Sequence, residues 1–375
     1  MSEHQVAVIG AGPAGVSVAL SLHDRGLRPL LIDGADEVGS SWRGRYDRLK
    51  LNTGRPFSHL PNRPYPKGTP MFPSRDEVVA HLDGHAHKAG IELRLGTAVN
   101  RIDRRPGGWR LETSTGDIDT RQVVVATGNQ HTPVVPEWPG MEGFTGELLH
   151  SADYRNPGPY RAKKALVVGC GSSGMEIVHD LATGGAAKAW LAVRTPPNIM
   201  LRSAPGGLSA DVIAVPLYHV PIRIADAIGR AARRANLGDL SEFGLPIPEE
   251  GVYAGVARAD KVPALVDMEV IDAVRDGSIE VVATVESFDG DKVELVDGSR
   301  LDPDVVICAT GYRRDLEPLV GHLGVLDAKG KPLVQGDKPA AQGLRFIGFM
   351  SRPSFIGFVA KQSKRIAKRI DGELR

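Results

Sequence analysis

Hydrophobic residues come in short unbroken runs along much of the chain, and several of these runs stop at a cluster of glycines. Residues 5–9 form the first run, and after the glycines apolar residues recur at helical spacing from residue 16. A short apolar run is typical of a strand buried on both faces of a parallel sheet. Residues 29–32 form another run, and residues 164–168 begin a second series of the same kind. The pattern predicts an α/β fold in which strands and helices alternate.

The first glycine cluster has the spacing G-x-G-x-x-G, and it supplies five candidate nucleotide contacts: Gly10, Gly12, Pro13, Ala14 and Gly15. Gly10 would make the tight turn, Gly12 would let backbone N–H groups reach a pyrophosphate, and Gly15 would let helix and strand pack closely. The helix N-terminus presents partial positive charge to that anion. Asp33 ends the next strand, where a carboxylate can hydrogen-bond ribose hydroxyls. These residues predict a site for an adenine dinucleotide with a free 2′-hydroxyl.

A second cluster has the same spacing and supplies Gly169, Gly171, Ser172, Ser173 and Gly174. The strand that follows it ends at Arg194 and Thr195 instead of at an acid. A guanidinium and a hydroxyl can bind the 2′-phosphate that a carboxylate would repel, so the second nucleotide is predicted to be NADPH. The alternative is that Arg194 is only a solvated residue at a strand end. Together the two clusters predict FAD and NADPH in one chain.

Two further β-branched runs end in the same tripeptide, and they add Ala126, Thr127, Gly128, Ala309, Thr310, Gly311 and the following Tyr312 as candidate contacts. Strands that end at glycine in this way are expected where backbone approaches a bound nucleotide. The repeat therefore predicts two Rossmann-like dinucleotide-binding domains. We place the FAD-binding domain at residues 1–160 and 300–375, with the NADPH-binding domain, residues 161–299, inserted into it.

Composition removes several other classes of function. The chain has 375 residues, with 46 Lys and Arg against 45 Asp and Glu, and this balance argues against nucleic acid as a partner. Its two cysteines, Cys170 and Cys308, form neither a disulfide framework nor a C-x-x-C pair, so we expect a cytoplasmic protein. No apolar run reaches about 18 residues, so we expect no transmembrane segment.

Three segments with charged or titratable residues remain. His81, His85 and His87 lie in a predicted helix but lack the carboxylates or thiolates that would complete a metal site, so no metal is expected. Residues 222–235 predict a basic amphipathic helix, for which a packed helix is favoured over a substrate lid or a membrane-surface contact. Residues 361–370 predict a closing surface helix with a solvated basic face.

Residues 144–154 match the motif F-x-G-x-x-x-H-x-x-x-[YF] in full, and residues 309–312 spell ATGY. In both features the chain resembles the flavin-containing monooxygenases among the class B flavin monooxygenases. The resemblance implies flavin contacts at Gly39 and Trp42. It departs at Asp33, where the family usually has Glu, and at Ser172, where it usually has Asn. Residues 237–245 and 261–265 are similar to the YUCCA-type branch, the indole-3-pyruvate monooxygenases.

The resemblance also implies a reaction. NADPH reduces FAD, the reduced flavin forms a C4a-(hydro)peroxyflavin with O₂, and one oxygen atom is inserted into a small organic substrate. Asn52 stands where the general flavin-containing monooxygenases have an Asn implicated in holding the oxygenated flavin, whereas the YUCCA-type branch typically has His. Its implied role is peroxide stabilisation; the alternative is a turn-forming Asn before Thr53 and Gly54.

The identity of the substrate therefore stays open at this point. It is either a 2-oxo acid that loses CO₂, such as indole-3-pyruvate, or a soft nitrogen or sulfur nucleophile. A pyridine nucleotide-dependent flavoprotein reductase and an NADPH sensor that consumes no oxygen are the alternatives to oxygenation. The expected partners are the small-molecule substrate and O₂, and a homodimer is left open.

Overall fold

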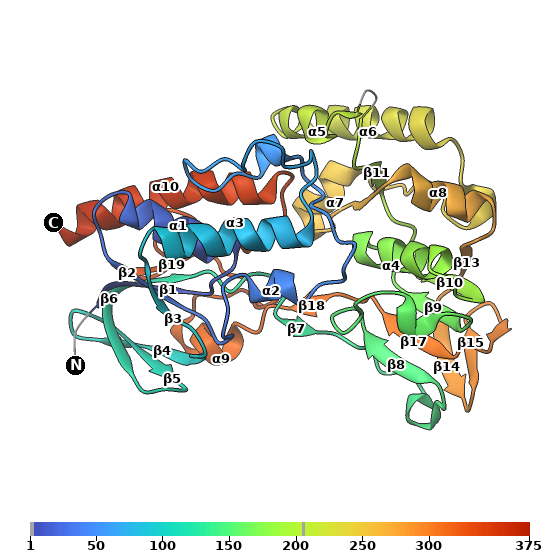
Figure 1. Cartoon of the computed structure of the whole chain (residues 1–375), viewed down its shortest axis with the longest axis horizontal. Helices are drawn as coiled ribbons and strands as arrows, with labels where there is room; N and C mark the ends of the chain where they lie inside the picture. The colour runs from blue at the N-terminus through green and yellow to red at the C-terminus, as the bar shows by residue number, and fades with distance from the viewer. Residues whose placement is uncertain (1–3, 205–206) are drawn as a thin grey trace.

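The computed structural model describes residues 4–204 and 207–375, which form two α/β bodies lying side by side (Figure 1). The first body is built on a sheet of order β3-β2-β1-β6-β5-β4, with β19 also paired to β6. Its strands are β1 (His4–Ile9), β2 (Pro29–Ile32), β3 (Glu92–Arg94), β4 (Val99–Arg105), β5 (Gly108–Thr113), β6 (Ile118–Val125) and β19 (Leu344–Phe346). Strands β3, β2, β1, β6 and β19 are parallel, whereas β4 and β5 form an antiparallel hairpin against the start of β6.

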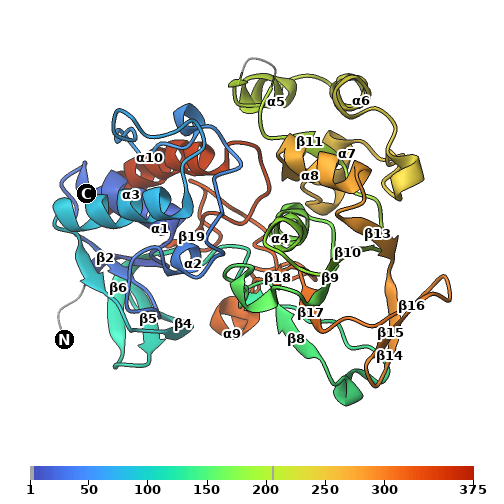
Figure 2. The ribbon, with the colours of Figure 1, turned by 45° about the vertical axis from the view of Figure 1, so that its right-hand side comes forward.

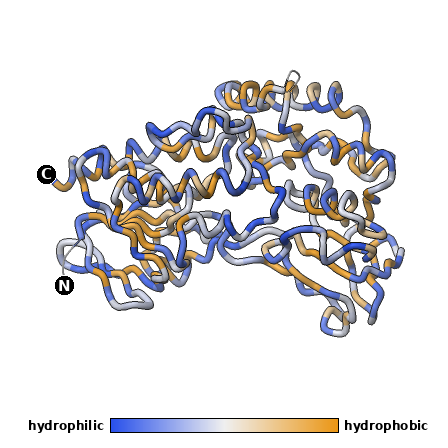
Figure 3. Tube along the Cα trace, viewed as in Figure 1, coloured by the Kyte–Doolittle hydropathy of each residue, from blue (hydrophilic) through white to orange (hydrophobic). Residues whose placement is uncertain are grey.

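Alternate side chains of the first sheet enter two different cores. Val6 and Val8 pack under the helices α1 (Pro13–His23), α3 (Arg75–Lys88) and α10 (Phe355–Leu374). Ala7 and Ile9 pack on the other side, against the β4–β5 hairpin and α9 (Glu317–Val320). Because both faces are covered, these strands are continuous apolar runs in the sequence, and they form the orange bundle at the left of Figure 3.

The second body has a parallel sheet of order β13-β10-β9-β17-β8. Its strands are β8 (Glu147–His150), β9 (Lys164–Val168), β10 (Lys188–Val193), β13 (Glu280–Ala283) and β17 (Val305–Cys308). Helices α4 (Ser172–Thr183) and α8 (Met268–Arg275) cover one face. The other face is covered by the antiparallel strands β14 (Val285–Asp289), β15 (Lys292–Leu295) and β16 (Arg300–Leu301).

The two sheets repeat one topology. The parallel part of the first sheet runs β3-β2-β1-β6-β19, and the second runs β13-β10-β9-β17-β8, so that β1 corresponds to β9 and β6 to β17. Since all strands of the second sheet fall between β6 and β19, the second domain is inserted into the first, as predicted. The sheet nevertheless extends beyond residues 161–299, because β8 and β17 are bonded into it from residues assigned to the FAD-binding domain.

The remaining elements connect or cover these bodies. Strands β7 (Thr132–Pro133) and β18 (Tyr312–Arg313) pair antiparallel where the chain passes between the domains. An outer layer beyond α4 contains β11 (Ile199–Leu201), β12 (Ala264–Val266), α5 (Asp211–Leu217), α6 (Ile222–Leu237) and α7 (Val252–Ala259). Figure 2 shows α5 and α6 as the outermost elements of this layer. The short helix α2 (Ser40–Arg43) follows β2. In the described part of the chain, no helix is both long and apolar enough to cross a bilayer.

Candidate functional site

The first glycine cluster forms a tight turn between β1 and α1 that is pressed against the end of β6. Gly10 has φ +104°, and a Cβ there would lie 2.7 Å from Ala126 O. A Cβ at Gly15 would lie 1.7 Å from Gly10 O. At Gly12, by contrast, the nearest atom to a Cβ would be Ser41 Oγ at 3.9 Å. Gly10 and Gly15 are therefore required by the protein's own packing, whereas Gly12 borders open space, as a pyrophosphate site needs.

The second cluster repeats this arrangement between β9 and α4. Gly169 has φ +109°, and a Cβ there would lie 2.5 Å from Ala309 O, while a Cβ at Gly174 would lie 1.8 Å from Gly169 O. A Cβ at Gly171 would meet no described atom within 4 Å. The backbone carbonyl of the alanine in each Ala-Thr-Gly segment thus lies directly against a glycine turn.

Asp33 lies at the end of β2, beside the first cluster. Its Oδ2 accepts a hydrogen bond from Ala11 N at 2.6 Å, and its Oδ1 accepts one from Ala35 N at 2.9 Å. The carboxylate therefore holds the glycine turn and its own loop together. This places it at the carboxyl edge of the sheet, where ligands of such folds bind.

The basic residues predicted for the second cluster lie at the corresponding edge. Arg194 and Thr195 are both exposed just beyond β10. The carbonyl of Thr195 accepts a contact from Cys170 Sγ at 3.4 Å, and burial raises the pKa of the Cys170 thiol. Ser172 Oγ accepts a hydrogen bond from Leu265 N at 2.9 Å, which ties the start of α4 to β12.

A loop between α2 and α3 contains the predicted residue Asn52. Leu51 N donates to Pro73 O at 2.8 Å, and Gly54 N donates to Asp211 Oδ2 at 2.9 Å, so the loop is fixed on both sides of Asn52. The Oδ1 atom of Asn52 is buried and accepts no hydrogen bond from any described residue. An orphaned buried acceptor of this kind indicates a missing partner.

Other predicted flavin contacts lie near the first cluster. Thr127 Oγ1, directly after Ala126, is likewise buried and has no hydrogen-bond partner among the described residues. Gly39 has φ +73°, and its N–H donates to Ala11 O at 3.0 Å. Trp42 is half-buried and packs against the core beneath α1. Two turns and an unpaired hydroxyl therefore converge at the carboxyl edge of the first sheet.

The return segment after β17 is held by side chains of both domains. His150 Nε2 lies 3.1 Å from Gly311 O, and burial lowers the pKa of His150. The Thr310 hydroxyl donates to Val134 O, and Arg45 donates to the Tyr312 hydroxyl, with its guanidinium 4.8 Å from the ring centre. The side chains of Thr310 and Tyr312 are thus hydrogen-bonded to residues of the protein, Val134 and Arg45.

Sequence reasoning missed a buried polar network that joins the domains. Tyr46, from the first domain, donates to Glu176 on α4, and Arg202 pairs with the same carboxylate. Tyr154, the last residue of the F-x-G-x-x-x-H motif, is fully buried and donates to Asp180 Oδ2 at 2.8 Å. Burial raises the pKa of Glu176. The motif's tyrosine is therefore a structural contact to α4.

Sequence reasoning also missed Asp211, at the start of α5. It is 7% exposed, and besides Gly54 N its carboxylate accepts the hydroxyls of Ser209 and Ser354, the latter at 2.9 Å. It thereby joins the Asn52 loop, α5 and the start of α10. No local sequence signal marks it, because Gly54 and Ser354 are 157 and 143 residues away.

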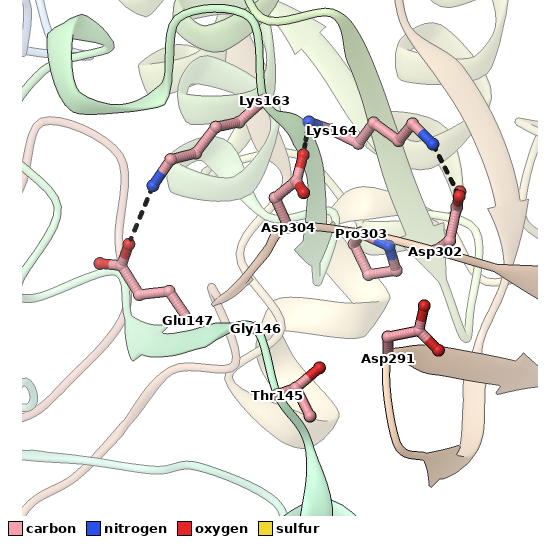
Figure 4. A pocket seen from close by; sticks show the side chains of 9 residues that line it. All are labelled: Thr145, Gly146, Glu147, Lys163, Lys164, Asp291, Asp302, Pro303 and Asp304. Atoms are coloured by element: carbon pink, nitrogen blue, oxygen red, sulfur yellow. Dashed lines mark hydrogen bonds and ion pairs between the residues drawn. The ribbon is translucent and has the colours of Figure 1, made fainter.

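A polar hollow in the second domain lies away from this site. Figure 4 shows Lys163 and Lys164 directed to Glu147 at 3.6 Å and Asp302 at 2.6 Å. These residues surround the amino ends of β8, β9 and β17, opposite the glycine turn. Ligands of parallel α/β sheets bind at the carboxyl ends, so this hollow is not the nucleotide site.

The histidines of α3 divide between the core and the surface. His81 is 6% exposed and stacks on Tyr65 with 4.0 Å between ring centres, whereas His87 is exposed and lies 3.3 Å from Asp83. Among the described residues, no group of three or more His, Cys, Asp or Glu side chains is placed to hold a metal ion.

Comparison with known proteins agrees with the two-cluster architecture. Residues 7–199 match the family model described as pyridine nucleotide-disulphide oxidoreductase. The chain is 34% identical over 359 residues to the probable indole-3-pyruvate monooxygenase YUCCA7 of Arabidopsis thaliana, covering 92% of this chain and 83% of that protein. It is also 34% identical to the indole-3-pyruvate monooxygenase YUCCA1 of Oryza sativa subsp. japonica, over 92% of this chain and 86% of the relative.

A solved structure shares the whole fold. The flavin-containing monooxygenase from Stenotrophomonas maltophilia superposes with a TM-score of 0.75 at 21% identity, covering 100% of both chains.

Proposed function

Because the chain belongs to the family of flavin-dependent monooxygenases that includes the YUCCA proteins, we propose that it inserts one oxygen atom into a small organic substrate. It is an oxidoreductase, and flavin monooxygenases of this family use FAD and NADPH. The observation that best supports the proposal is the pair of equivalent glycine turns, one beside an acid and the other beside an arginine. Each turn leaves space in front of its middle glycine, Gly12 or Gly171.

The residues present fit the two cofactors. The turn at Gly12 and the N-terminus of α1 would hold the pyrophosphate of FAD, with Asp33 beside its ribose and Thr127 offering its unpaired hydroxyl. The turn at Gly171 would hold the NADPH pyrophosphate, with Arg194 free to meet the 2′-phosphate. When bound, the cofactors supply hydride transfer and oxygen activation, and the protein supplies binding, orientation and fixed dipoles.

Asn52 is the proposed catalytic residue of the chain. Its carboxamide is uncharged and keeps its donor hydrogens at neutral pH, so it can hold a reactive oxygen in place without protonating it. The loop that contains it is fixed by Leu51 and Gly54, which pre-orients the side chain. Replacing Asn52 with alanine should leave NADPH oxidation intact but divert oxygen to H₂O₂. Asn236→Ala, an exposed residue of α6, is the matched control.

The first candidate substrate is a 2-oxo acid such as indole-3-pyruvate, which would lose CO₂ as it is oxygenated. The support for it is the identity of 34% to the two YUCCA proteins over nearly the whole chain. The purified protein, supplied with FAD, NADPH and indole-3-pyruvate, should release CO₂ in proportion to the NADPH consumed. Indole-3-pyruvate left unaltered while NADPH is oxidised would remove this candidate.

The second candidate is oxygenation of a soft nitrogen or sulfur nucleophile. It is favoured by Asn52, the residue that resembles the general flavin-containing monooxygenases. A panel of thioethers and tertiary amines, analysed for sulfoxides and N-oxides, tests it directly.

Disulfide reduction is disfavoured by the cysteines. Cys308 is fully buried in β17, and burial raises the pKa of its thiol to about 12. The thiolate is the reactive form in disulfide exchange, and a thiol with that pKa supplies almost none at neutral pH.

A further inference from the structure

Helix α6 differs from an ordinary surface helix because it buries two charged residues and exposes isoleucines. Asp226 and Arg233 point inward and are 5% and 6% exposed. Ile224 and Ile228 point outward and are 52% and 41% exposed. Most surface helices do the opposite and bury an apolar stripe. The packed helix favoured from the sequence is therefore present, but it packs through two charged residues as well as through Ala225 and Leu237.

Both buried charged residues are hydrogen-bonded to neighbouring segments, and these bonds fix the orientation of α6. Asp226 Oδ1 accepts a hydrogen bond from Tyr253 N at 2.7 Å, at the start of α7. Arg233 donates to the carbonyls of Pro197 and Leu245, each at 2.9 Å. Turning α6 over to bury its isoleucines would leave a carboxylate and a guanidinium without these partners, at a large cost in free energy.

Exposed aliphatic side chains are concentrated on α5 and α6. Ten large hydrophobic residues are exposed in the described chain, and six of them lie between residues 208 and 228: Leu208, Val212, Ile213, Ile222, Ile224 and Ile228. Ile213 of α5 and Ile228 of α6 line one apolar hollow. Single exposed aliphatics are ordinary, but a cluster of this kind marks a surface that is covered by something else. We call these six residues the aliphatic patch.

Positive charge follows the aliphatic patch along α6. Arg223, Arg230 and Arg234 are spaced at i, i+7 and i+11, so they share one side of the helix, next to the side that presents Ile224 and Ile228. In residues 207–237, all described, the only acids are Asp211 and Asp226, and both are buried. The exposed surface of these two helices is therefore cationic as well as apolar.

We propose that α5 and α6 bind the surface of a bilayer that contains anionic lipids, with the aliphatic patch inserted between head groups and the arginines on lipid phosphates. An apolar side flanked by arginines is the pattern of helices that lie in the membrane interface. A second copy of this chain fits less well, because in a symmetric contact the same arginines would face one another with no exposed acid on either helix. Figures 1 and 2 show both helices at the outer boundary of the molecule.

Co-flotation of the full-length protein with vesicles tests the proposal without any need for turnover. The protein should float with vesicles of equal parts phosphatidylcholine and phosphatidylglycerol, and much less with phosphatidylcholine alone. Replacing Arg223 and Arg234 together by glutamine should weaken binding about 25-fold, since each arginine near an anionic surface is worth about fivefold. Ile224→Ser with Ile228→Ser should weaken it by about tenfold or more, because both side chains lose apolar burial.

The C-terminal helix α10 supplies the matched control. It has exposed Arg365 and Lys368, but it buries its aliphatic residues Ile366 and Ile370. Arg365→Gln with Lys368→Gln removes the same charge and should leave flotation unchanged. An equal loss in this control would overturn the proposal in favour of general charge attraction. The proposal would also be overturned if the protein did not float with the anionic vesicles. It would be overturned as well if sedimentation showed a dimer that only the isoleucine variant disrupts.

Discussion

The carboxylate of Asp211 accepts a hydrogen bond from the backbone N–H of Gly54 at 2.9 Å, two residues after Asn52. Asp211→Asn would place an amide NH₂ group opposite an N–H or a hydroxyl donor, so at least one of these bonds would be lost. We expect the free energy of unfolding to fall by about 1–3 kcal/mol. We also expect the fraction of NADPH oxidised that appears as H₂O₂ to rise, because the Asn52 loop loses its anchor. Glu242→Gln, an exposed substitution, is the control. A lower free energy of unfolding with an unchanged H₂O₂ yield would show that Asp211 stabilises the fold without positioning Asn52.

Two glycines of the first turn should respond differently to alanine. Gly12→Ala should fold normally, because its backbone is extended and a Cβ there has room, but it should fail to retain FAD since the Cβ occupies the pyrophosphate approach. Gly15→Ala should fail to fold stably, because its Cβ would overlap Gly10 O. Flavin absorbance and thermal melting of the purified variants separate the two effects. Gly84→Ala, exposed on α3 with no neighbour to the new Cβ, should keep both properties. A yellow Gly12→Ala protein would contradict the proposed FAD site.

Arg194 should determine the choice between NADPH and NADH. A charge-assisted contact to a 2′-phosphate is worth about 1.5–3 kcal/mol, so Arg194→Ala should raise the KM for NADPH by about 10- to 100-fold and leave the KM for NADH nearly unchanged. Steady-state NAD(P)H oxidation measures both constants. Arg161→Ala, exposed just before β9 at the opposite edge of the sheet, should change neither. If the substitution changed the KM values for NADPH and NADH equally, Arg194 would be only a solvated residue at a strand end.

His81 should make the fold sensitive to acid. Burial lowers its pKa from 6.5 to about 4, so the unfolded chain takes up the proton more readily than the folded one. The contribution of neutral His81 to the free energy of unfolding is complete above about pH 6.5 and declines as the pH falls towards about 4. Near pH 5 the free energy of unfolding is lower by about 2 kcal/mol. His81→Phe keeps the stack on Tyr65 and removes the titration, so urea unfolding near neutral and acidic pH should differ less than in the parent.

The control for this experiment is His87→Gln, on the exposed side of the same helix, which should leave the acid sensitivity unchanged. If His81→Phe loses stability to acid as steeply as the parent, another group is responsible.

The two glycine turns were predictable from the sequence because their determinants are local. Gly10, Gly12 and Gly15 act within six residues of one another, and Asp33 follows at the end of the adjacent strand. The repeated Ala-Thr-Gly segments also predicted the duplicated domain, although not the contact of their alanines with Gly10 and Gly169. Assignment of these residues to FAD and NADPH contacts remains a prediction that the variants above test.

Features that depend on distant pairing were not predictable. Strand β8 follows the first domain in sequence, yet it is bonded to β17, more than 150 residues later, so its domain could not be assigned from local pattern. The sequence does not distinguish Glu176 from the other polar residues of α4, because its partners Tyr46 and Arg202 are brought to it only by the fold. The helical spacing of residues 222–235 correctly predicted α6, but periodicity alone could not say which side of the helix faces the protein.

The order of the strands also constrains synthesis on the ribosome. Strand β19 and helix α10 complete the first domain, with Ser363 bonded to Ser21 at 2.9 Å and Asp371 paired with Arg25 at 2.8 Å. Every strand of the inserted domain is translated before them. The inserted domain can therefore mature while the first domain still lacks the last strand and helix of its core. The dinucleotide turn of the first domain thus leaves the ribosome before the inserted domain, and the domain around it closes only after the inserted domain has been made.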